Sequence, residues 1–356
     1  MLKNDQTPPA PGSAGTPGEN AIETARPLVY DLFEPRLPIY WTDFLVSATL
    51  GWSAFVAVPG LPLFSPPQIA CFVLAALALY RAVIFIHELA HRRKNTFRLF
   101  RLVWNLTCGF PLMVPSFTYR GVHTDHHMRT IYGTAKDGEY LPFVARGRRS
   151  IVAYLLLTPL LPLLTASRFI VLTPLSYLHH GPRRWLWERA SSLAIDLAYR
   201  RPAPAPRDDP SWRLQEIACS LYGLTAVGLV VGGVLSPALL LLWYLVACTI
   251  FFLNALRTLA AHSYRNPGER RMTPTEQYLD SVNVPGHRVF TALWAPVGLR
   301  YHATHHLFPA MPYHALGKAH RRLVKQLPDN RAYLQATRNS LWHALKRLWD
   351  EAGQAF

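Results

Sequence analysis

Eight of the fifteen histidines lie in three short boxes whose spacing is typical of metal ligands. The boxes are HELAH, HTDHH and HATHH, and their histidines are His87 and His91; His123, His126 and His127; and His302, His305 and His306. On a helix, positions i, i+3 and i+4 share one face, so each box directs its imidazoles toward one point. Imidazole is the commonest metal-binding side chain, and one ion rarely takes more than about six donors. Eight convergent histidines therefore predict a site for two metal ions.

The other histidines lack this spacing, and we expect ordinary surface or core roles for His179, His180, His287, His314, His320 and His343. A single HxxHH box should arise by chance in roughly one chain in forty of this histidine content. Two such boxes together with an HxxxH box are therefore not accidental.

The composition indicates a membrane protein. Hydrophobic residues make up 50% of the chain and charged residues only 16%, well below the usual quarter. Lys and Arg exceed Asp and Glu by 37 to 21, yet residues 37–80 and 214–256 contain neither Lys nor Arg. Positive charge that is excluded from apolar windows follows the positive-inside rule and argues against nucleic-acid binding.

Each of these two windows has the length of two membrane spans joined by a tight turn. We predict an all-α membrane protein with two transmembrane helical hairpins, interfacial helices and a cytoplasmic histidine-rich cap. The four spans are expected near 40–58, 67–87, 215–233 and 238–260. Basic residues flank the hairpins and are absent from their tips, which predicts that the three boxes lie on the cytoplasmic side.

One apolar stretch, residues 151–178, does not fit a simple span. It contains Pro159, Pro162, Pro174 and Arg168, so we predict that it lies in the membrane interface. A single additional crossing would place HATHH on the opposite side of the membrane from HELAH. A shared metal site therefore requires an even number of crossings.

Outside this membrane domain, predicted over residues 36–320, the sequence suggests two further regions. Residues 1–35 begin with a segment rich in Pro, Gly, Ala and Thr, and we expect a disordered tail. Residues 321–356 combine spaced leucines with many Arg and Lys, which is typical of basic amphipathic helices. The four cysteines form no CxxC pair and are expected to be packing residues.

The three boxes, together with LeuPheProAlaMetProTyrHisAlaLeu at 307–316, resemble the membrane fatty acid desaturase superfamily over roughly residues 40–320. An HxxxH first box and two HxxHH boxes are closest to the acyl-lipid desaturases. The resemblance implies two iron ions, O2 as co-substrate and insertion of a double bond into the acyl chain of a membrane lipid. It also implies a separate electron donor, of the ferredoxin or cytochrome type, on the cytoplasmic face. By affinity alone, zinc or copper could occupy the same nitrogen ligands.

The resemblance also points to residues outside the box histidines. Members of the superfamily tend to recruit a histidine just after the last span, and His262 occupies that place. Metal-bound imidazoles commonly donate their outer N–H to a carboxylate. Candidates for that role are Glu88, Asp125, Asp137 and Glu139.

Three alternatives remain open at this stage. Enzymes with the same site hydroxylate or ketolate lipids, alkanes or carotenoids. HELAH also matches the HExxH motif of zinc proteases, in which Glu88 would be the general base. A metal transporter is the non-enzymatic alternative, although its ligands should lie at mid-membrane depth. For the desaturase interpretation we expect a multi-pass protein of the cell inner membrane.

Overall fold

The computed structural model describes residues 24–92, 96–203, 209–327 and 330–354. Across these ranges the fold is helical and has no strand, apart from isolated bridges such as the one between His262 and Ser281. Four helices are long and apolar enough to cross a membrane. They are α2 (Leu37–Ala57), α3 (Pro66–His91), α11 (Asp209–Val231) and α12 (Pro237–Ala261). The predicted all-α fold with four membrane-spanning helices is confirmed.

The second helix of each hairpin begins with the same pair of residues. Ser65 accepts a hydrogen bond from the backbone N–H of Gln68, and Ser236 accepts one from Ala238. Proline follows both serines at the first helical position, where its missing N–H costs no hydrogen bond. Serine caps and prolines thus set where α3 and α12 begin.

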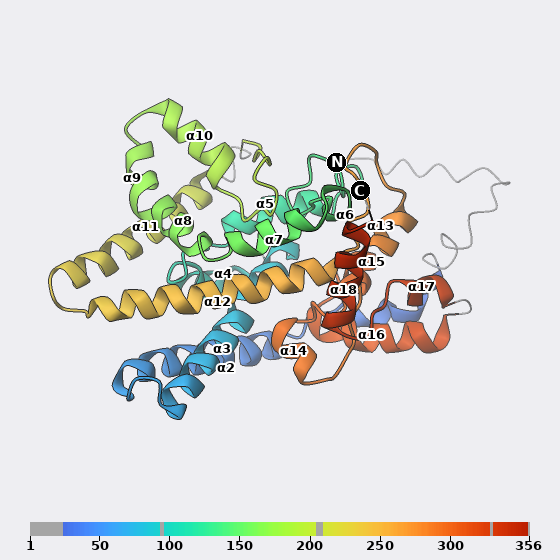
Figure 1. Ribbon diagram of the computed structural model, residues 1–356, viewed down its shortest axis with the longest axis horizontal. Coiled ribbons are helices and arrows are strands. Elements are labelled where there is room, and N and C mark those ends of the chain that lie inside the picture. Colours follow the sequence, from blue (N-terminus) through green and yellow to red (C-terminus); the bar gives the residue numbers. More distant parts are fainter. Residues whose placement is uncertain (1–23, 93–95, 204–208, 328–329, 355–356) are drawn as a thin grey trace.

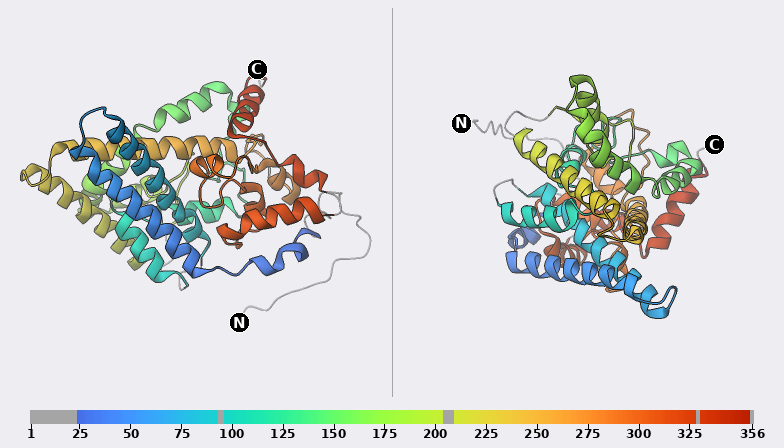
Figure 2. Two further views of the ribbon diagram at one scale, coloured as in Figure 1. Left: turned by 90° about the horizontal axis from the view of Figure 1, so that it is seen from below. Right: turned by 90° about the vertical axis from the view of Figure 1, so that its left-hand side faces the viewer.

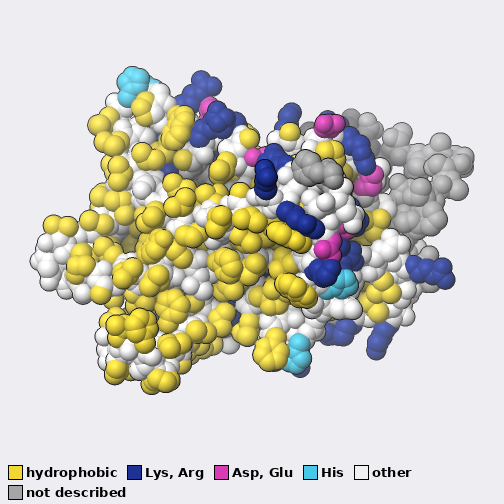
Figure 3. All heavy atoms as spheres, in the orientation of Figure 1, with side chains coloured by type: hydrophobic (Ala, Val, Ile, Leu, Met, Phe, Trp, Pro, Cys, Tyr) yellow, Lys and Arg dark blue, Asp and Glu magenta, His cyan; other side chains and the backbone are white. Residues whose placement is uncertain are grey.

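Both hairpin tips lie at the left-hand end of the molecule in Figure 1. The helices after α12 gather at the opposite end, beside the ends of α3 and α12 (Figures 1 and 2). Figure 3 shows hydrophobic side chains over most of the left-hand part of this face and Lys and Arg toward the right and along the upper edge. The hairpins thus point their tips in the same direction, as an even number of crossings requires.

The first hairpin is closely packed. Phe44 of α2 is fully buried and contacts the rings of Phe85 and Phe100. At the margin of this aromatic core, Arg81 donates two hydrogen bonds to the carboxylate of Asp43, at 2.6 and 2.5 Å. Burial of aromatic rings and this paired ion bridge hold α2 against α3.

The second hairpin is open, because other elements lie between its helices. α12 packs against α3, α7 (Arg148–Leu157) and α8 (Leu161–Ser167), whereas α11 packs against the π-helix η4 (Arg168–Leu172) and α9 (Thr173–Ser176). The proline-rich segment is thus inserted as a wedge. Residues 148–157 and 161–176 are bent by 52° relative to one another, so they form a broken or re-entrant element rather than a fifth straight span.

The remaining elements are short helices. They are η1 (Pro27–Leu32), η2 (Val58–Gly60), α4 (Arg98–Trp104), η3 (Asn105–Gly109), α5 (Phe117–His126), α6 (Phe143–Arg146), α10 (His180–Ala190), α13 (Pro274–Asp280), α14 (Phe290–Trp294), α15 (His302–Leu307), α16 (Tyr313–Gln326), α17 (Arg331–Gln335) and α18 (Leu341–Ala352).

The predicted disordered tail over residues 1–35 differs from the structure at its end. Residues 1–23 lie outside the described residues. Within η1, however, Val29 and Leu32 are buried against the apolar face of α16. Burial of these side chains orders the segment, which a composition dominated by the preceding Pro and Gly residues does not reveal.

Candidate metal centre

All nine histidines singled out in the sequence lie together, in two groups. The first group contains His87, His91, His123, His127 and His305, and the second contains His126, His262, His302 and His306. Within each group, the candidate ligand nitrogens lie within 4.8 Å of one another. Five histidines in one group and four in the adjoining group have the composition of a dinuclear site.

The nitrogen separations fit metal coordination. His91 and His123 bring their Nε2 atoms to 2.7 Å, and His127 and His305 to 3.1 Å. In the second group, the Nε2 of His302 lies 2.9 Å from that of His262 and 3.1 Å from that of His306. Two nitrogens bound at right angles about 2.1 Å from one ion lie about 3.0 Å apart. Histidines in both groups therefore approach each other as neighbouring ligands do.

The boxes divide between the groups according to their spacing. The i and i+4 histidines stay together, as His123 and His127 do in the first group. The i+3 histidine of each HxxHH box goes to the other group, because it projects about 100° from its neighbour on the helix. His127 and His306 stack at a ring-centroid distance of 4.4 Å, which joins the groups. The sequence predicted two ions but not this division.

Four elements position the imidazoles. α3 supplies His87 and His91 from its last turn, and His262 directly follows the last residue of α12. α5 and α15 carry the two HxxHH boxes. Asn283 fixes α15, because its side-chain oxygen accepts hydrogen bonds from the backbone N–H and hydroxyl of Thr304, at 3.0 and 3.2 Å.

Two predicted carboxylates lie against the outer nitrogens of the histidines. Asp137 lies 2.9 Å from Nδ1 of His126, and Glu139 lies 3.1 Å from Nδ1 of His123. Both Nε2 atoms are thereby turned toward their groups. This arrangement orients the rings and increases their basicity as ligands.

Three further residues, which the sequence did not indicate, bond to the outer nitrogens of the histidines or to their partners. Tyr119 bonds to Nδ1 of His123 at 3.0 Å, and Tyr132 bonds to Nδ1 of His262 at 2.9 Å. Tyr132 also donates to Asp280, at 2.9 Å. Tyr119 precedes His123 by four residues, so its helical spacing was a usable signal. Asp280 has no such relation to any box.

No hydrogen bond in the described residues joins the remaining two carboxylates to a box histidine, so nothing in the geometry supports their predicted role. Glu88 accepts hydrogen bonds from Tyr40 and Arg92, on the side of α3 away from the groups. Asp125 accepts one from Tyr199, at 2.7 Å. Each carboxylate lies inside a box but on a different face of its helix, where other partners are available.

Burial keeps most of these imidazoles neutral. Desolvation holds the pKa values of His127, His305 and His306 well below the usual range for histidine. For His126, burial lowers the pKa, but the charge and hydrogen bond of Asp137 together with the charges of Glu139 and Asp280 outweigh it, and the net pKa is raised. Burial also raises the pKa of Glu139 to about 7. Neutral imidazole is the form that binds metal, so burial favours the metal-binding form of these histidines over the protonated imidazolium.

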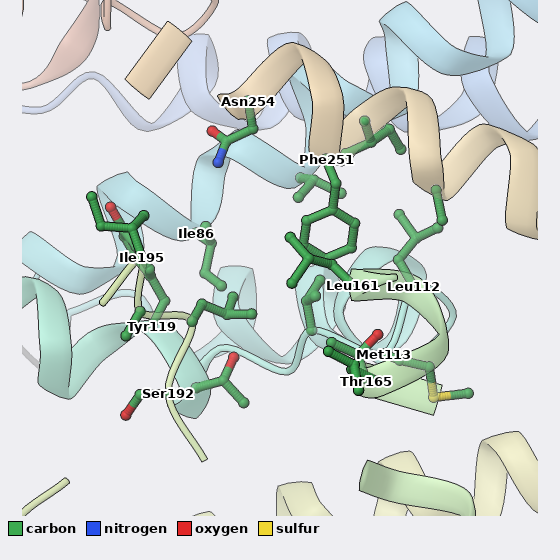
Figure 4. A pocket seen from close by; sticks show the side chains of 18 of the residues that line it. Ile86, Leu112, Met113, Tyr119, Leu161, Thr165, Ser192, Ile195, Phe251 and Asn254 are labelled. Atoms are coloured by element: carbon green, nitrogen blue, oxygen red, sulfur yellow. The ribbon is translucent and has the colours of Figure 1, made fainter. Parts of the chain in front are cut away.

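A cavity of about 360 Å³ reaches the first group at His87. Its lining is mostly apolar and includes Leu112, Leu161 and Phe251 (Figure 4). The volume lies within the range of about 300–1,000 Å³ that is typical of small-molecule sites. The cavity lies between α12 and the wedge of α8 and η4.

Comparison with known proteins agrees with this geometry. Residues 64–338 match the family model described as fatty acid desaturase. The chain belongs to this family. It is also 39% identical over 330 residues to a protein of Caulobacter vibrioides (strain NA1000 / CB15N) named ceramide hydroxylase, and the match covers 93% of each chain.

As a member of the fatty acid desaturase family, the chain is a membrane oxidoreductase of lipid metabolism. The zinc protease alternative also conflicts with the position of Glu88. A general base should face the metal, whereas Glu88 is bound to Tyr40 and Arg92. Metal transport is disfavoured because the histidines lie at the ends of α3 and α12 rather than at mid-span.

Proposed function

We propose that the protein is a di-iron membrane oxygenase that hydroxylates ceramide or a ceramide-like lipid. The observation that carries this proposal is the apolar cavity that ends at one of two adjoining histidine groups. The likeness to a ceramide hydroxylase over 93% of both chains supports the substrate class and the product.

Nine histidines are assigned as ligands in this proposal, five to one iron and four to the other. Zinc and copper also bind imidazole, and iron is favoured here because the chemistry proposed for the site requires a metal that activates O2. When bound, iron supplies the activation of O2 that removal of hydrogen from an unactivated carbon requires and that no side chain provides. Asp137, Glu139 and the Tyr132–Asp280 pair orient imidazoles and supply negative charge around the cations.

Hydroxylation and desaturation use the same O2, electrons and protons but differ in the hydrogens removed and the water released. Hydroxylation converts one C–H bond to C–OH and consumes O2, two electrons and two protons, with release of one water. Desaturation removes two hydrogens and releases two waters from the same O2, electrons and protons. Acyl-chain desaturation, which the boxes suggested first, is the alternative here, and the named relative is the reason that we favour hydroxylation.

The residues of the chain itself bind the lipid and exclude water. Apolar side chains of α8, η4 and α12 surround the hydrocarbon in the cavity, and Tyr119 lines the cavity and bonds to His123. Exclusion of water protects a reactive site from side reactions. Hydrogen bonds hold the rings of His123 and His126 in fixed orientations, so substrate binding need not reorganise them.

We further propose that the histidine groups face the cytoplasm and that the protein resides in the cell inner membrane. Lys and Arg gather at the end of the molecule that carries the boxes (Figure 3). The electron donor in this proposal is a separate ferredoxin-type or cytochrome-type protein, and a basic face suits an acidic donor.

Expression in a host that contains ceramide, followed by mass spectrometry of its lipids, tests the function. We expect a gain of about 16 Da in ceramide. A loss of about 2 Da would establish desaturation instead. Unchanged lipids in an iron-loaded, reduced preparation with added ceramide would contradict both.

The matched variants are His126→Ala and His305→Ala, one from each group, with His343→Ala as control because His343 is exposed and belongs to neither group. The first two should lose activity by at least about a hundredfold, whereas the control should retain it. Wild-type activity in both group variants would refute the assigned site.

A further inference from the structure

Part of the cavity lining is polar, and this part lies on α12, the helix that directly precedes His262. α12 contributes Ala247, Ile250 and Phe251 to the lining, and then Asn254 and Arg257 on the turns nearest the histidines. Figure 4 shows the amide of Asn254 directed into the cavity, with Ile86 and Tyr119 opposite. Along α12, the lining therefore changes from apolar to polar toward the histidines, whereas other polar side chains, such as Arg168 and Ser192, come from other segments.

Arg257 fixes the orientation of this amide. It is only 9% exposed, and its Nη2 donates to the side-chain oxygen of Asn254, at 2.9 Å. Because a guanidinium only donates, the oxygen of Asn254 must face Arg257 and the amide NH2 must face the cavity. Within the described residues, the NH2 donates to no protein acceptor, and Nε of Arg257 is buried without a hydrogen-bond partner.

A donor that lines a mostly apolar cavity without a protein acceptor gains a hydrogen bond when a ligand supplies the acceptor. The complementary group is a hydrogen-bond acceptor, such as a carbonyl or hydroxyl oxygen. A purely hydrocarbon segment would leave the donor unsatisfied, so this position does not suit the middle of an acyl chain.

The position along the helices relates this donor to the metal centre. α3 and α12 both run from a hairpin tip to the histidines, and they end at His91 and Ala261. His87 lies four residues before the first end, and Asn254 lies seven before the second. Both residues line the cavity and lie within about two turns of the helix ends that carry the histidines.

We propose that Asn254, held by Arg257, binds the carbonyl or hydroxyl oxygen of the lipid's polar linkage and so selects a carbon close to that linkage for oxidation. This inference rests on the proposed function for its substrate class. The hydrocarbon then extends from Asn254 toward Phe251 and Leu161, away from the histidines. In an N-acyl lipid, the oxidised carbon lies within a few bonds of the amide rather than at mid-chain.

Binding provides the first test. Wild-type protein without reductant is mixed with a short-chain dihydroceramide or with an alkane of equal carbon number, and native mass spectrometry measures the bound fraction. Asn254→Leu and Arg257→Met should weaken dihydroceramide binding about tenfold and leave alkane binding unchanged. Equal weakening of binding for dihydroceramide and alkane would indicate a merely structural role. No weakening would refute the proposal that Asn254, held by Arg257, binds the polar linkage; we call this pair the anchor.

Two control variants separate the anchor from general damage. Arg184→Met removes an exposed arginine outside the cavity lining and should change neither affinity. Phe251→Leu alters the apolar lining and should weaken the binding of dihydroceramide and of the alkane to the same extent.

Product position provides the second test. Fragmentation of the product should place the wild-type modification next to the amide, and Asn254→Leu should spread it over several positions. A mid-chain modification in the wild type would overturn the inference even if it is a hydroxyl group. A double bond beside the amide, lost in Asn254→Leu, would refute hydroxylation and keep the anchor.

Discussion

The two hairpins share a plan but differ in packing. In the first, α2 lies along α3 over an aromatic core that includes Phe44 and Phe85. In the second, α11 and α12 are separated by the wedge of α8, η4 and α9, and the cavity lies beside α12. Each hairpin also supplies histidines to a different group, His87 and His91 from α3 and His262 from α12. One hairpin thus acts as a rigid support, and the other provides space for a substrate.

The largest effect on stability is expected in the core of the first hairpin. Phe44→Ala removes a fully buried ring that contacts Phe85 and Phe100. We expect the free energy of unfolding in detergent to fall by about 3–5 kcal/mol. The matched variant in the second hairpin, Phe252→Ala, removes a ring that is 44% exposed and should cost under about 1 kcal/mol. Equal losses would remove the contrast between the hairpins.

A smaller effect is expected from the ion pair that joins α2 to α3. Arg81→Met breaks the two hydrogen bonds to Asp43 and leaves its carboxylate with the hydroxyls of Tyr313, at 2.8 Å, and Ser47, at 3.5 Å. Chemical denaturation should give a loss of about 1–3 kcal/mol. Arg184→Met, which removes an exposed pair with Glu188, should cost no more than about 0.5 kcal/mol. A loss in Arg81→Met no larger than in this control would show that the pair does not hold the hairpin.

The smallest effect on stability is expected for a side chain that fills the cavity. Leu161→Trp should change the free energy of unfolding by less than about 1 kcal/mol, because the added ring enters open space. Oxidation of the lipid should nevertheless fall at least about tenfold, since the tryptophan ring and the hydrocarbon chain of the lipid compete for the same volume. Leu160→Trp is the control, because Leu160 is 51% exposed and does not line the cavity. Undiminished turnover in Leu161→Trp would place the substrate elsewhere.

The histidine boxes predicted much of the metal centre because their spacing is a local property. Positions i and i+4 share a helix face whatever the fold, so the spacing alone indicates that histidines such as His123 and His127 converge. Which group receives His126 or His305 depends on how α5 and α15 are rotated against α3, and that is set by packing. The boxes therefore predict two ions but not how the ligands are divided.

Carboxylates were harder to predict for the same reason. Asp137 and Glu139 follow the second box in a turn that folds back onto α5, whereas Asp280 reaches His262 through Tyr132 from a distant helix. Glu88 is adjacent to a ligand in sequence yet points to Arg92. Adjacency in the chain does not specify the direction in which a side chain points.

Among the spans, periodicity and charge predicted the helices, but the opening of the second hairpin depends on tertiary contacts of the proline-rich wedge.

The count of iron per chain tests the central claim of a centre divided between the two hairpins. Metal analysis of freshly purified, iron-reconstituted protein should give about two irons in the wild type and in His343→Ala. His91→Ala, from the first hairpin, and His262→Ala, from the second, should each retain one iron or fewer. A single iron in the wild type, or two in both His91→Ala and His262→Ala, would contradict the account.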